Sequence, residues 1–244
     1  MTVSIPNYAY SYKRNAKPVF VPSGIGRRIG VELKLAVEAA YRFEPIYFHL
    51  RAGGHVAAIH HHRDSLMFAR IDISNFFYSV SRRRVKSALD RIGIGKADFF
   101  SKWSTVANPY GDPAWALPYG FVQSPILASL VLATSDVGDH LRNLPATVVT
   151  SVYVDDISLS SDDEVALRDA YESTLAALVA DGFTVSVPKL RPPAAAIDLF
   201  NCDLTTGRSV VRDERIETFL ATAPGPASED AFVAYCASVE VGNR

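Results

Sequence analysis

Hydrophobic residues along the 244-residue chain follow two patterns, one typical of strands and one of helices. Short runs rich in β-branched and aromatic residues, such as 147–154, 157–159 and 197–204, predict strands. Apolar residues recur at helical spacing in 31–41 and 164–180, which predicts two amphipathic helices. Strands and helices in this order indicate an α+β fold, with an antiparallel sheet backed by helices.

Turn-forming residues and helix caps suggest the remaining elements. Residues 8–30 mix aromatic, basic, proline and glycine residues, and therefore predict short strands and turns. Residues 124–144 predict a helix, with Ser124 as its cap and Pro125 in its first position. Two further predictions are a strand at 183–187 and two short helices within 213–244.

The composition fits a globular protein with a sizeable core, since 48% of the residues are hydrophobic. Two cysteines do not make a disulfide framework. The first ten residues lack the basic and apolar regions of a signal peptide. No apolar run approaches the roughly 18 residues of a membrane span. The expected location is therefore the cytoplasm, without a membrane partner.

Two adjacent carboxylates, Asp155 and Asp156, separate the strands predicted at 147–154 and 157–159. A tight turn usually contains glycine, whereas two neighbouring acids repel each other and need compensation. Oxygen ligands around a divalent cation provide it. Asp72 lies in another apolar strand pattern, where an unpaired acid would be costly to bury. The three acids together predict a site for two Mg²⁺ ions about 3.5–4 Å apart.

Three motifs, in this order, carry a family resemblance. The stretch 68–80 around Asp72 resembles the first catalytic motif of reverse transcriptases, and Tyr-Val-Asp-Asp at 153–156 resembles their YxDD signature. The stretch 117–125 resembles the motif between the two. The chain thus resembles a bacterial reverse transcriptase of the retron-like and defence-associated groups.

The resemblance implies a right-hand polymerase of fingers and palm, with an antiparallel palm sheet backed by helices and a short helical thumb. Residues 1–66 would form the fingers and residues 67–208 the palm, with a fingers insertion around 92–116. Residues 209–244 would form a truncated thumb.

The implied activity is RNA-directed DNA polymerisation, a nucleotidyl transfer that adds dNTPs to a 3′-hydroxyl with two Mg²⁺ ions, or with Mn²⁺. The implied ligands are Asp72, Asp155, Asp156 and the backbone carbonyl of Ile73. Lys189 is implied to protonate the leaving pyrophosphate as a general acid. A solvent-exposed loop lysine is an equal alternative for Lys189.

The resemblance also implies substrate contacts. Lys13 and Lys17 resemble the pair that holds the incoming triphosphate, although a solvated basic turn fits equally well. Phe77 resembles the aromatic residue that excludes a ribonucleotide 2′-hydroxyl, with a core aromatic as the alternative. The middle motif adds Tyr119, Gly120, Gln123 and Ser124.

The implied partners are an RNA template or non-coding RNA, a DNA product, dNTPs, and a partner protein or second polymerase subunit; the implied role is antiviral defence. Two alternatives stay open: template-independent or protein-primed synthesis at the same site, and a non-catalytic palm-like subunit that binds nucleic acid.

The run 82–84 of three arginines fits either a solvated first helical turn or a phosphate contact. The three histidines at 60–62 predict a polar helix surface rather than a zinc site.

Overall fold

The computed structural model describes residues 6–244 and divides the chain into two compact units. Unit 1 comprises the residues up to Glu44, Ile73–Arg142 and Leu178–Thr184. Unit 2 comprises Pro45–Asp72, Asn143–Ala177 and Val185–Arg244. Residues 45–66 and 209–244 both fall into unit 2 with the strands that carry Asp72 and Asp156, and the boundaries of fingers, palm and thumb stay a prediction.

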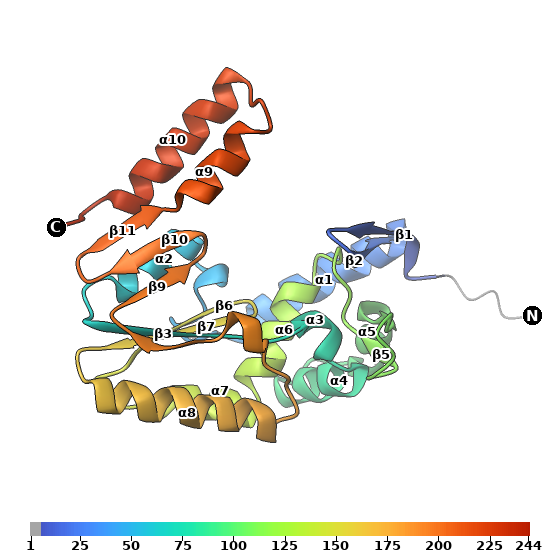
Figure 1. Ribbon diagram of the computed structural model, residues 1–244. Coiled ribbons are helices and arrows are strands. Elements are labelled where there is room, and N and C mark those ends of the chain that lie inside the picture. Colours follow the sequence, from blue (N-terminus) through green and yellow to red (C-terminus); the bar gives the residue numbers. More distant parts are fainter. Residues whose placement is uncertain (1–5) are drawn as a thin grey trace, which may run out of the picture. The chain divides into compact units, whose positions relative to one another are not determined.

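Unit 2 is built on an antiparallel sheet of four strands in the order β6-β7-β3-β8 (Figure 1). These are β3 (Met67–Asp72), β6 (Val149–Tyr153), β7 (Asp156–Ser161) and β8 (Arg191–Ala194). Strand β8 contains Pro192 and Pro193, which an edge strand tolerates because one of its sides needs no ladder hydrogen bonds. The sheet confirms the predicted antiparallel α+β architecture.

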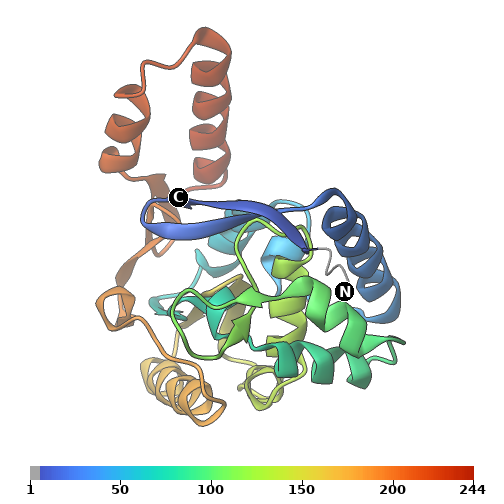
Figure 2. The ribbon, with the colours of Figure 1, turned by 90° about the vertical axis from the view of Figure 1, so that its right-hand side faces the viewer.

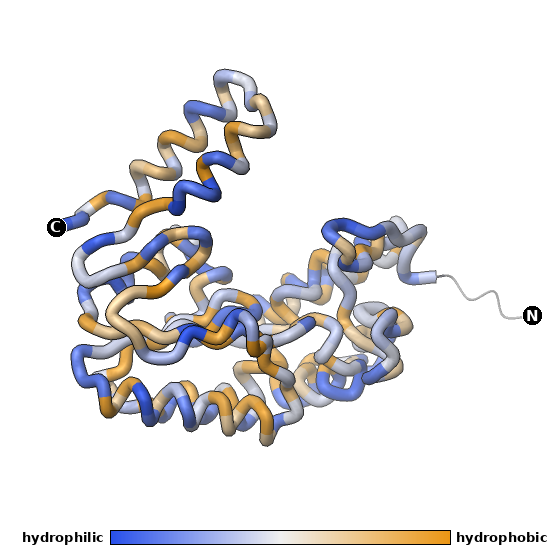
Figure 3. Tube along the Cα trace, in the orientation of Figure 1, coloured by the Kyte–Doolittle hydropathy of each residue, from blue (hydrophilic) through white to orange (hydrophobic). Residues whose placement is uncertain are grey.

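Helices cover the two faces of this sheet. Helix α2 (Gly54–His62) packs against β6, and α8 (Glu164–Ala180) runs along the opposite face (Figure 1). Hydrophilic and hydrophobic residues alternate around α8 (Figure 3), and Leu167 and Tyr171 are buried. The spacing that predicted this helix therefore corresponds to one buried face.

A second sheet and a helical pair complete unit 2. Its strands are β9 (Ala196–Leu199), β10 (Cys202–Thr205) and β11 (Arg208–Val211), followed by α9 (Asp213–Leu220) and α10 (Pro226–Glu240). The two helices lie side by side (Figure 2), with the rings of Phe219 and Phe232 stacked 4.0 Å apart. The two predicted C-terminal helices are confirmed.

Unit 1 surrounds α6 (Ser124–Ala133), in which every residue except Pro125 is buried. A helix that is apolar on all sides belongs at the centre of its unit. The other elements are β1 (Tyr8–Arg14), β2 (Lys17–Pro22), α1 (Gly24–Ala40), α3 (Phe76–Ser79), α4 (Arg82–Arg91), α5 (Ala97–Ser104), β4 (Val106–Ala107), β5 (Trp115–Ala116) and α7 (Asp136–Arg142).

Two helix predictions are wrong at their ends. Helix α1 begins at Gly24, inside the region expected to form turns, because the hydroxyl of Ser23 accepts a hydrogen bond from the Gly26 N–H. The helix predicted over 124–144 stops at Ala133, where the hydroxyls of Thr134 and Ser135 bond back to carbonyls of the preceding turn. Its cap position is Gln123 rather than Ser124.

Two strand predictions are wrong. The stretch 183–187 leads instead into a 3₁₀ turn, η2 (Val187–Lys189), since Pro188 has no N–H for a ladder. The strand predicted over 197–204 is a hairpin, because Phe200 and Asn201 take φ values of 53° and 62°. Residues 76–78, in the stretch that resembles the first catalytic motif, do not continue β3 but form the first part of helix α3.

Among residues 6–244, no helix is both long enough and apolar enough to cross a membrane.

His62 lies in the interior of unit 2, contrary to the predicted polar helix surface. Its side chain is 1% exposed, with Nδ1 2.8 Å from Ser160 Oγ and Nε2 2.7 Å from Ser151 Oγ. Burial, helped by the nearby His61, lowers the pKa of His62 to about 3. The neutral ring has one donor and one acceptor nitrogen, which match the two hydroxyls. His62 therefore ties α2 to β6 and β7, the two strands of the hairpin that carries Asp155 and Asp156, which we call the acidic hairpin.

We predict that His62 makes the protein less stable in acid. Unfolded chains protonate this histidine below about pH 6.5, whereas the folded protein resists protonation down to about pH 3, so stability falls as the pH falls between these values. The slope from this one group is about 1.4 kcal/mol per pH unit in the middle of the window. Urea unfolding at several pH values should show that the free energy of unfolding falls less steeply with decreasing pH in His62→Gln than in the wild type. An unchanged slope would contradict the assignment.

Candidate active site

The turn between β6 and β7 places the two neighbouring acids differently from the prediction. Tyr153 pairs with Asp156, so the turn consists of Val154 and Asp155 alone, and Asp156 already belongs to β7. Val154 has φ 58°, a backbone conformation that is strained for a β-branched side chain. Asp155 and Asp156 therefore differ in backbone environment, and the turn needs support from its surroundings.

His49 supplies that support from the same unit. It lies in the 3₁₀ turn η1 (Phe48–Leu50), and its Nδ1 accepts a hydrogen bond from the Val154 N–H at 3.0 Å. Burial lowers the pKa of His49 to about 4, against a weaker opposing contact of Nδ1 with the Val152 carbonyl oxygen at 3.4 Å. The neutral ring with its proton on Nε2 satisfies the shorter contact. The sequence contains no motif that points to this histidine.

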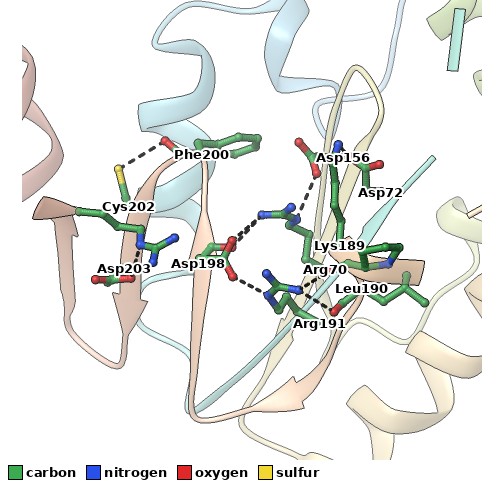
Figure 4. Close-up of polar contacts among 12 residues, drawn as sticks. Arg70, Asp72, Asp156, Lys189, Leu190, Arg191, Asp198, Phe200, Cys202 and Asp203 are labelled. Atoms are coloured by element: carbon green, nitrogen blue, oxygen red, sulfur yellow. Dashed lines mark hydrogen bonds and ion pairs between the residues drawn. The ribbon is translucent and has the colours of Figure 1, made fainter. Parts of the chain in front are cut away.

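Asp72 and Asp156 lie directly opposite each other in the β3–β7 register (Figure 4). Asp155 stands in the adjoining turn. The structure thus brings the three predicted acids together within unit 2. Burial raises the pKa of Asp156 to about 7; the positive charge of Arg70 opposes this shift, and the charges of Asp155 and Asp72 add to it. Such a cluster favours bound cations.

Two side-chain cations already contact the acids. Lys189 Nζ lies 2.7 Å from Asp72 Oδ2, and Arg70 Nε lies 3.2 Å from Asp156 Oδ1. The second pair is close enough for an ion pair, but neither atom is aligned for a hydrogen bond. Burial disfavours the charged lysine, yet its hydrogen bond to Asp72 and the nearby acids raise the pKa of Lys189 overall. Lys189 is half exposed but is not a free loop lysine.

Arg70 also connects the site to the β9–β10 hairpin. Its Nη1 donates to the Asp198 carbonyl oxygen at 2.9 Å and lies 3.2 Å from Asp198 Oδ2 (Figure 4). Arg191 Nε binds the other carboxylate oxygen, Oδ1, at 2.5 Å. Sequence reasoning missed Arg70, although its position two residues before Asp72 places both side chains on one face of β3.

The acids offer the oxygen ligands that a divalent metal needs, but they are not arranged to hold one. Asp156 Oδ1 is buried without a hydrogen-bond partner, and carboxylate oxygens are the ligands that Mg²⁺ prefers. Across residues 6–244, however, no three His, Cys, Asp or Glu side chains are placed to hold a metal ion. The carboxylates of Asp72 and Asp156 face Lys189 and Arg70 instead. Ile73 follows Asp72 but is grouped with unit 1, so its carbonyl ligand stays a prediction.

Several of the predicted substrate residues gather in unit 1 around Tyr119. Its ring lies 4.8 Å from the ring of Phe77, centroid to centroid, and Lys17 Nζ is 5.4 Å from its centre. Gly120 has φ 101°, and a Cβ there would lie 2.2 Å from the Phe20 carbonyl oxygen, so only glycine fits. Lys13 is exposed on the β1–β2 hairpin.

Gln123 and Ser124 lie inside unit 1, each about 1% exposed. Gln123 packs against Gly30, where an added Cβ would lie 2.2 Å from Gln123 Oε1, and its Nε2 donates to Ser104 Oγ at 3.3 Å. Both side chains face the core, and a substrate contact by either would require unit 1 to open. Gln123 thus packs against Gly30 of α1 and Ser104 of α5 at the start of α6.

Comparison with known proteins gives one family match. Residues 13–192 match the family described as reverse transcriptase (RNA-dependent DNA polymerase). No match was found among the curated proteins.

The solved structures similar to this chain include three of larger proteins. Telomerase from Candida albicans, in complex with the TWJ fragment of telomeric RNA, is 13% identical over 77% of this chain and 39% of that chain, with a TM-score of 0.53. The foamy viral protease-reverse transcriptase with an RNA/DNA hybrid is 22% identical over 65% and 19%, with a TM-score of 0.46. Its dRH form with double-stranded DNA is 19% identical over 84% and 30%, with a TM-score of 0.49.

The chain therefore spans less than half the length of each of these proteins. The telomerase likeness confirms the mixed α+β fold of fingers and palm that the motifs implied. The family match covers all three motifs, from the strand that ends in Asp72 to the hairpin with Asp155 and Asp156. On this match, the chain belongs to the reverse transcriptase family.

Proposed function

We propose that this protein is an RNA-directed DNA polymerase that adds dNTPs to a 3′-hydroxyl, with divalent cations held by Asp72, Asp155 and Asp156. The observation that carries the proposal is the direct pairing of Asp72 with Asp156 across β3 and β7, with Asp155 in the adjoining turn. A protein that only bound nucleic acid would not need three acids in one place, because they repel phosphate.

The chain's own residues prepare the site for phosphoryl transfer. Bound Mg²⁺ would neutralise charge on the attacking oxygen and the leaving pyrophosphate. Arg70 lies between the carboxylates of Asp156 and Asp198, and Lys189 stays protonated beside Asp72. The ammonium group of Lys189 is therefore available to donate a proton to a leaving phosphate oxygen.

The first prediction from this proposal concerns Asp155. Asp155→Asn removes a negative charge and one carboxylate oxygen while keeping the side-chain size, so incorporation of labelled dNTPs on a primed RNA template should fall by more than about 100-fold. Asp169→Asn, an exposed residue on α8, is the matched control and should retain activity. If the Asp155 variant synthesises as much DNA as the wild type, the site assignment is wrong.

The same assay separates the alternative activities. Product formed without template would indicate template-independent synthesis, and product attached to the protein would indicate protein priming, for which Tyr10 on β1 is 60% exposed. If no product forms under any condition, even with co-purified partners, the protein is a non-catalytic subunit that binds nucleic acid. A role in antiviral defence, inferred from the motif resemblance, requires that cells lose protection from phage in the Asp155→Asn variant.

The second prediction concerns sugar selection. We infer that Phe77, fixed against Tyr119, excludes the 2′-hydroxyl of a ribonucleotide. Phe77→Ala should therefore increase rNTP incorporation relative to dNTP by about 10-fold or more, which a competition assay measures. Because Phe77 is only 7% exposed, Phe77→Leu serves as the packing control. An unchanged ratio in a folded Phe77→Ala protein would make Phe77 a core residue alone.

The third prediction concerns the support of the turn by His49. His49→Asn places an amide oxygen near the Nδ1 position and preserves the acceptor for Val154, whereas His49→Leu removes it. His49→Leu should lower kcat by about 10–100-fold and raise the Mg²⁺ concentration needed for half-maximal activity. His49→Asn should stay within a few-fold of wild type. Equal losses in both variants would show that the ring matters only for packing.

A further inference from the structure

Unit 1 contains a cavity of about 580 Å³ that none of the polymerase motifs uses. It lies among the start of β1, the end of α5 and the short β4–β5 pair. Tyr8, Trp103 and Trp115 contribute aromatic surface to it, and Arg82 and Lys102 contribute positive charge. Among the described residues that line the cavity, none is acidic. Its size is typical of sites for small ligands, which span about 300–1,000 Å³.

Arg82 and Trp115 form a fixed wall of this cavity. The guanidinium carbon of Arg82 lies 4.0 Å from the centre of the Trp115 ring, and Arg82 Nε donates to Thr105 Oγ1 at 2.8 Å. That hydroxyl in turn donates to the Ser101 carbonyl oxygen at 2.9 Å. Trp115 nevertheless stays 46% exposed. A large ring that is held in place but open to solvent is well suited to stack on a flat ligand.

Arg82 and Trp115 also border a second cavity of about 390 Å³. Arg83 and Lys86 add positive charge to this second cavity, and Asp98 is its acidic member. The two cavities share a positively charged and aromatic wall, and a ligand with alternating flat and anionic groups could extend from one into the other.

The three arginines at 82–84 have different roles. Arg84 pairs with Asp181 at 2.5 Å and lies 4.1 Å from the Phe183 ring centre, so it stabilises unit 1. Arg82 and Arg83 line the cavities instead. Neither a solvated helical turn nor a single phosphate contact describes the whole run.

We propose that the cavity of about 580 Å³ binds a base of single-stranded nucleic acid stacked on Trp115, with a neighbouring phosphate held by Arg82 and Lys102. The ligand class rests on the proposed polymerase function, whereas the site itself rests on the cavity. Stacking on aromatic rings along a basic groove is the general way in which proteins hold single strands without reading their sequence. A phosphate contact with the two cations would make the binding weaken with salt.

Intrinsic fluorescence reports directly on this site, because the chain has only two tryptophans and both line the cavity. Titration of the wild-type protein with short oligo(U) RNA, and separately with oligo(dT), should quench this fluorescence. A parallel titration with UMP tests whether a free nucleotide is sufficient for binding. Weak UMP binding with tight oligonucleotide binding supports a strand as the ligand, whereas equal binding of UMP would overturn that part of the proposal.

Affinity in the variants is measured by anisotropy of a labelled oligonucleotide. Trp115→Ala should weaken binding by about 5- to 150-fold, the range for loss of one stacked base, and Trp115→Phe should weaken it less. Lys102→Ala should weaken binding and flatten its salt dependence. Lys34→Ala is the matched control, because both lysines lie on unit 1 helices and pair with an acid one turn away. Thermal melting confirms that each variant folds.

The outcomes separate this proposal from the polymerase assignment. Unchanged affinity in folded Trp115→Ala and Lys102→Ala overturns the site, whether or not DNA is synthesised. Reduced affinity in both variants supports the site even if no incorporation occurs, since neither residue belongs to the acidic hairpin. Equal losses in Lys34→Ala would reduce the effect to general surface charge and would also overturn the site.

Discussion

The arrangement of unit 2 depends on the repulsion between carboxylates that the β3–β7 register places face to face. Asp72 and Asp156 are paired across the sheet, and Asp155 is one residue away. Buried like charges at this spacing are unfavourable unless cations or protons compensate them. Burial raises the pKa of Asp156, and the negative charges of Asp155 and Asp72 add to this shift. Positively charged side chains around the cluster compensate its negative charge.

The compensation comes from elements that are distant in sequence. Lys189 reaches Asp72 from a 3₁₀ turn, and Arg70 lies between Asp156 and the β9–β10 hairpin through Asp198. Since Arg70 is shared between two acids, movement of one would change the charge felt by the other. The acidic site and the second sheet are therefore electrostatically linked within unit 2.

Hydrogen bonds with two histidines hold the backbone and the strands of the hairpin in place. The strained Val154 N–H finds its hydrogen-bond acceptor in His49, and His62 of α2 fixes β6 and β7 through two serine hydroxyls. Both histidines are kept neutral by burial, so each retains an acceptor nitrogen. Strain at one turn is thus maintained by a rigid surrounding structure.

The sequence by itself determined the three acids, their order, and the α+β class, because a run of apolar residues interrupted by charge is visible without a structure. The amphipathic helix 164–180 was likewise predicted with its observed ends, since its spacing depends only on local geometry. Only the tertiary structure decided that Gln123 faces the core, that His62 is buried, and that Arg70 and His49 serve the acidic hairpin. The contacts of His62, Arg70 and His49 join residues 86 to 105 positions apart. Gln123 and Gly30 are likewise 93 positions apart. Chain periodicity cannot supply that information, because it describes neighbours along the chain rather than neighbours in space.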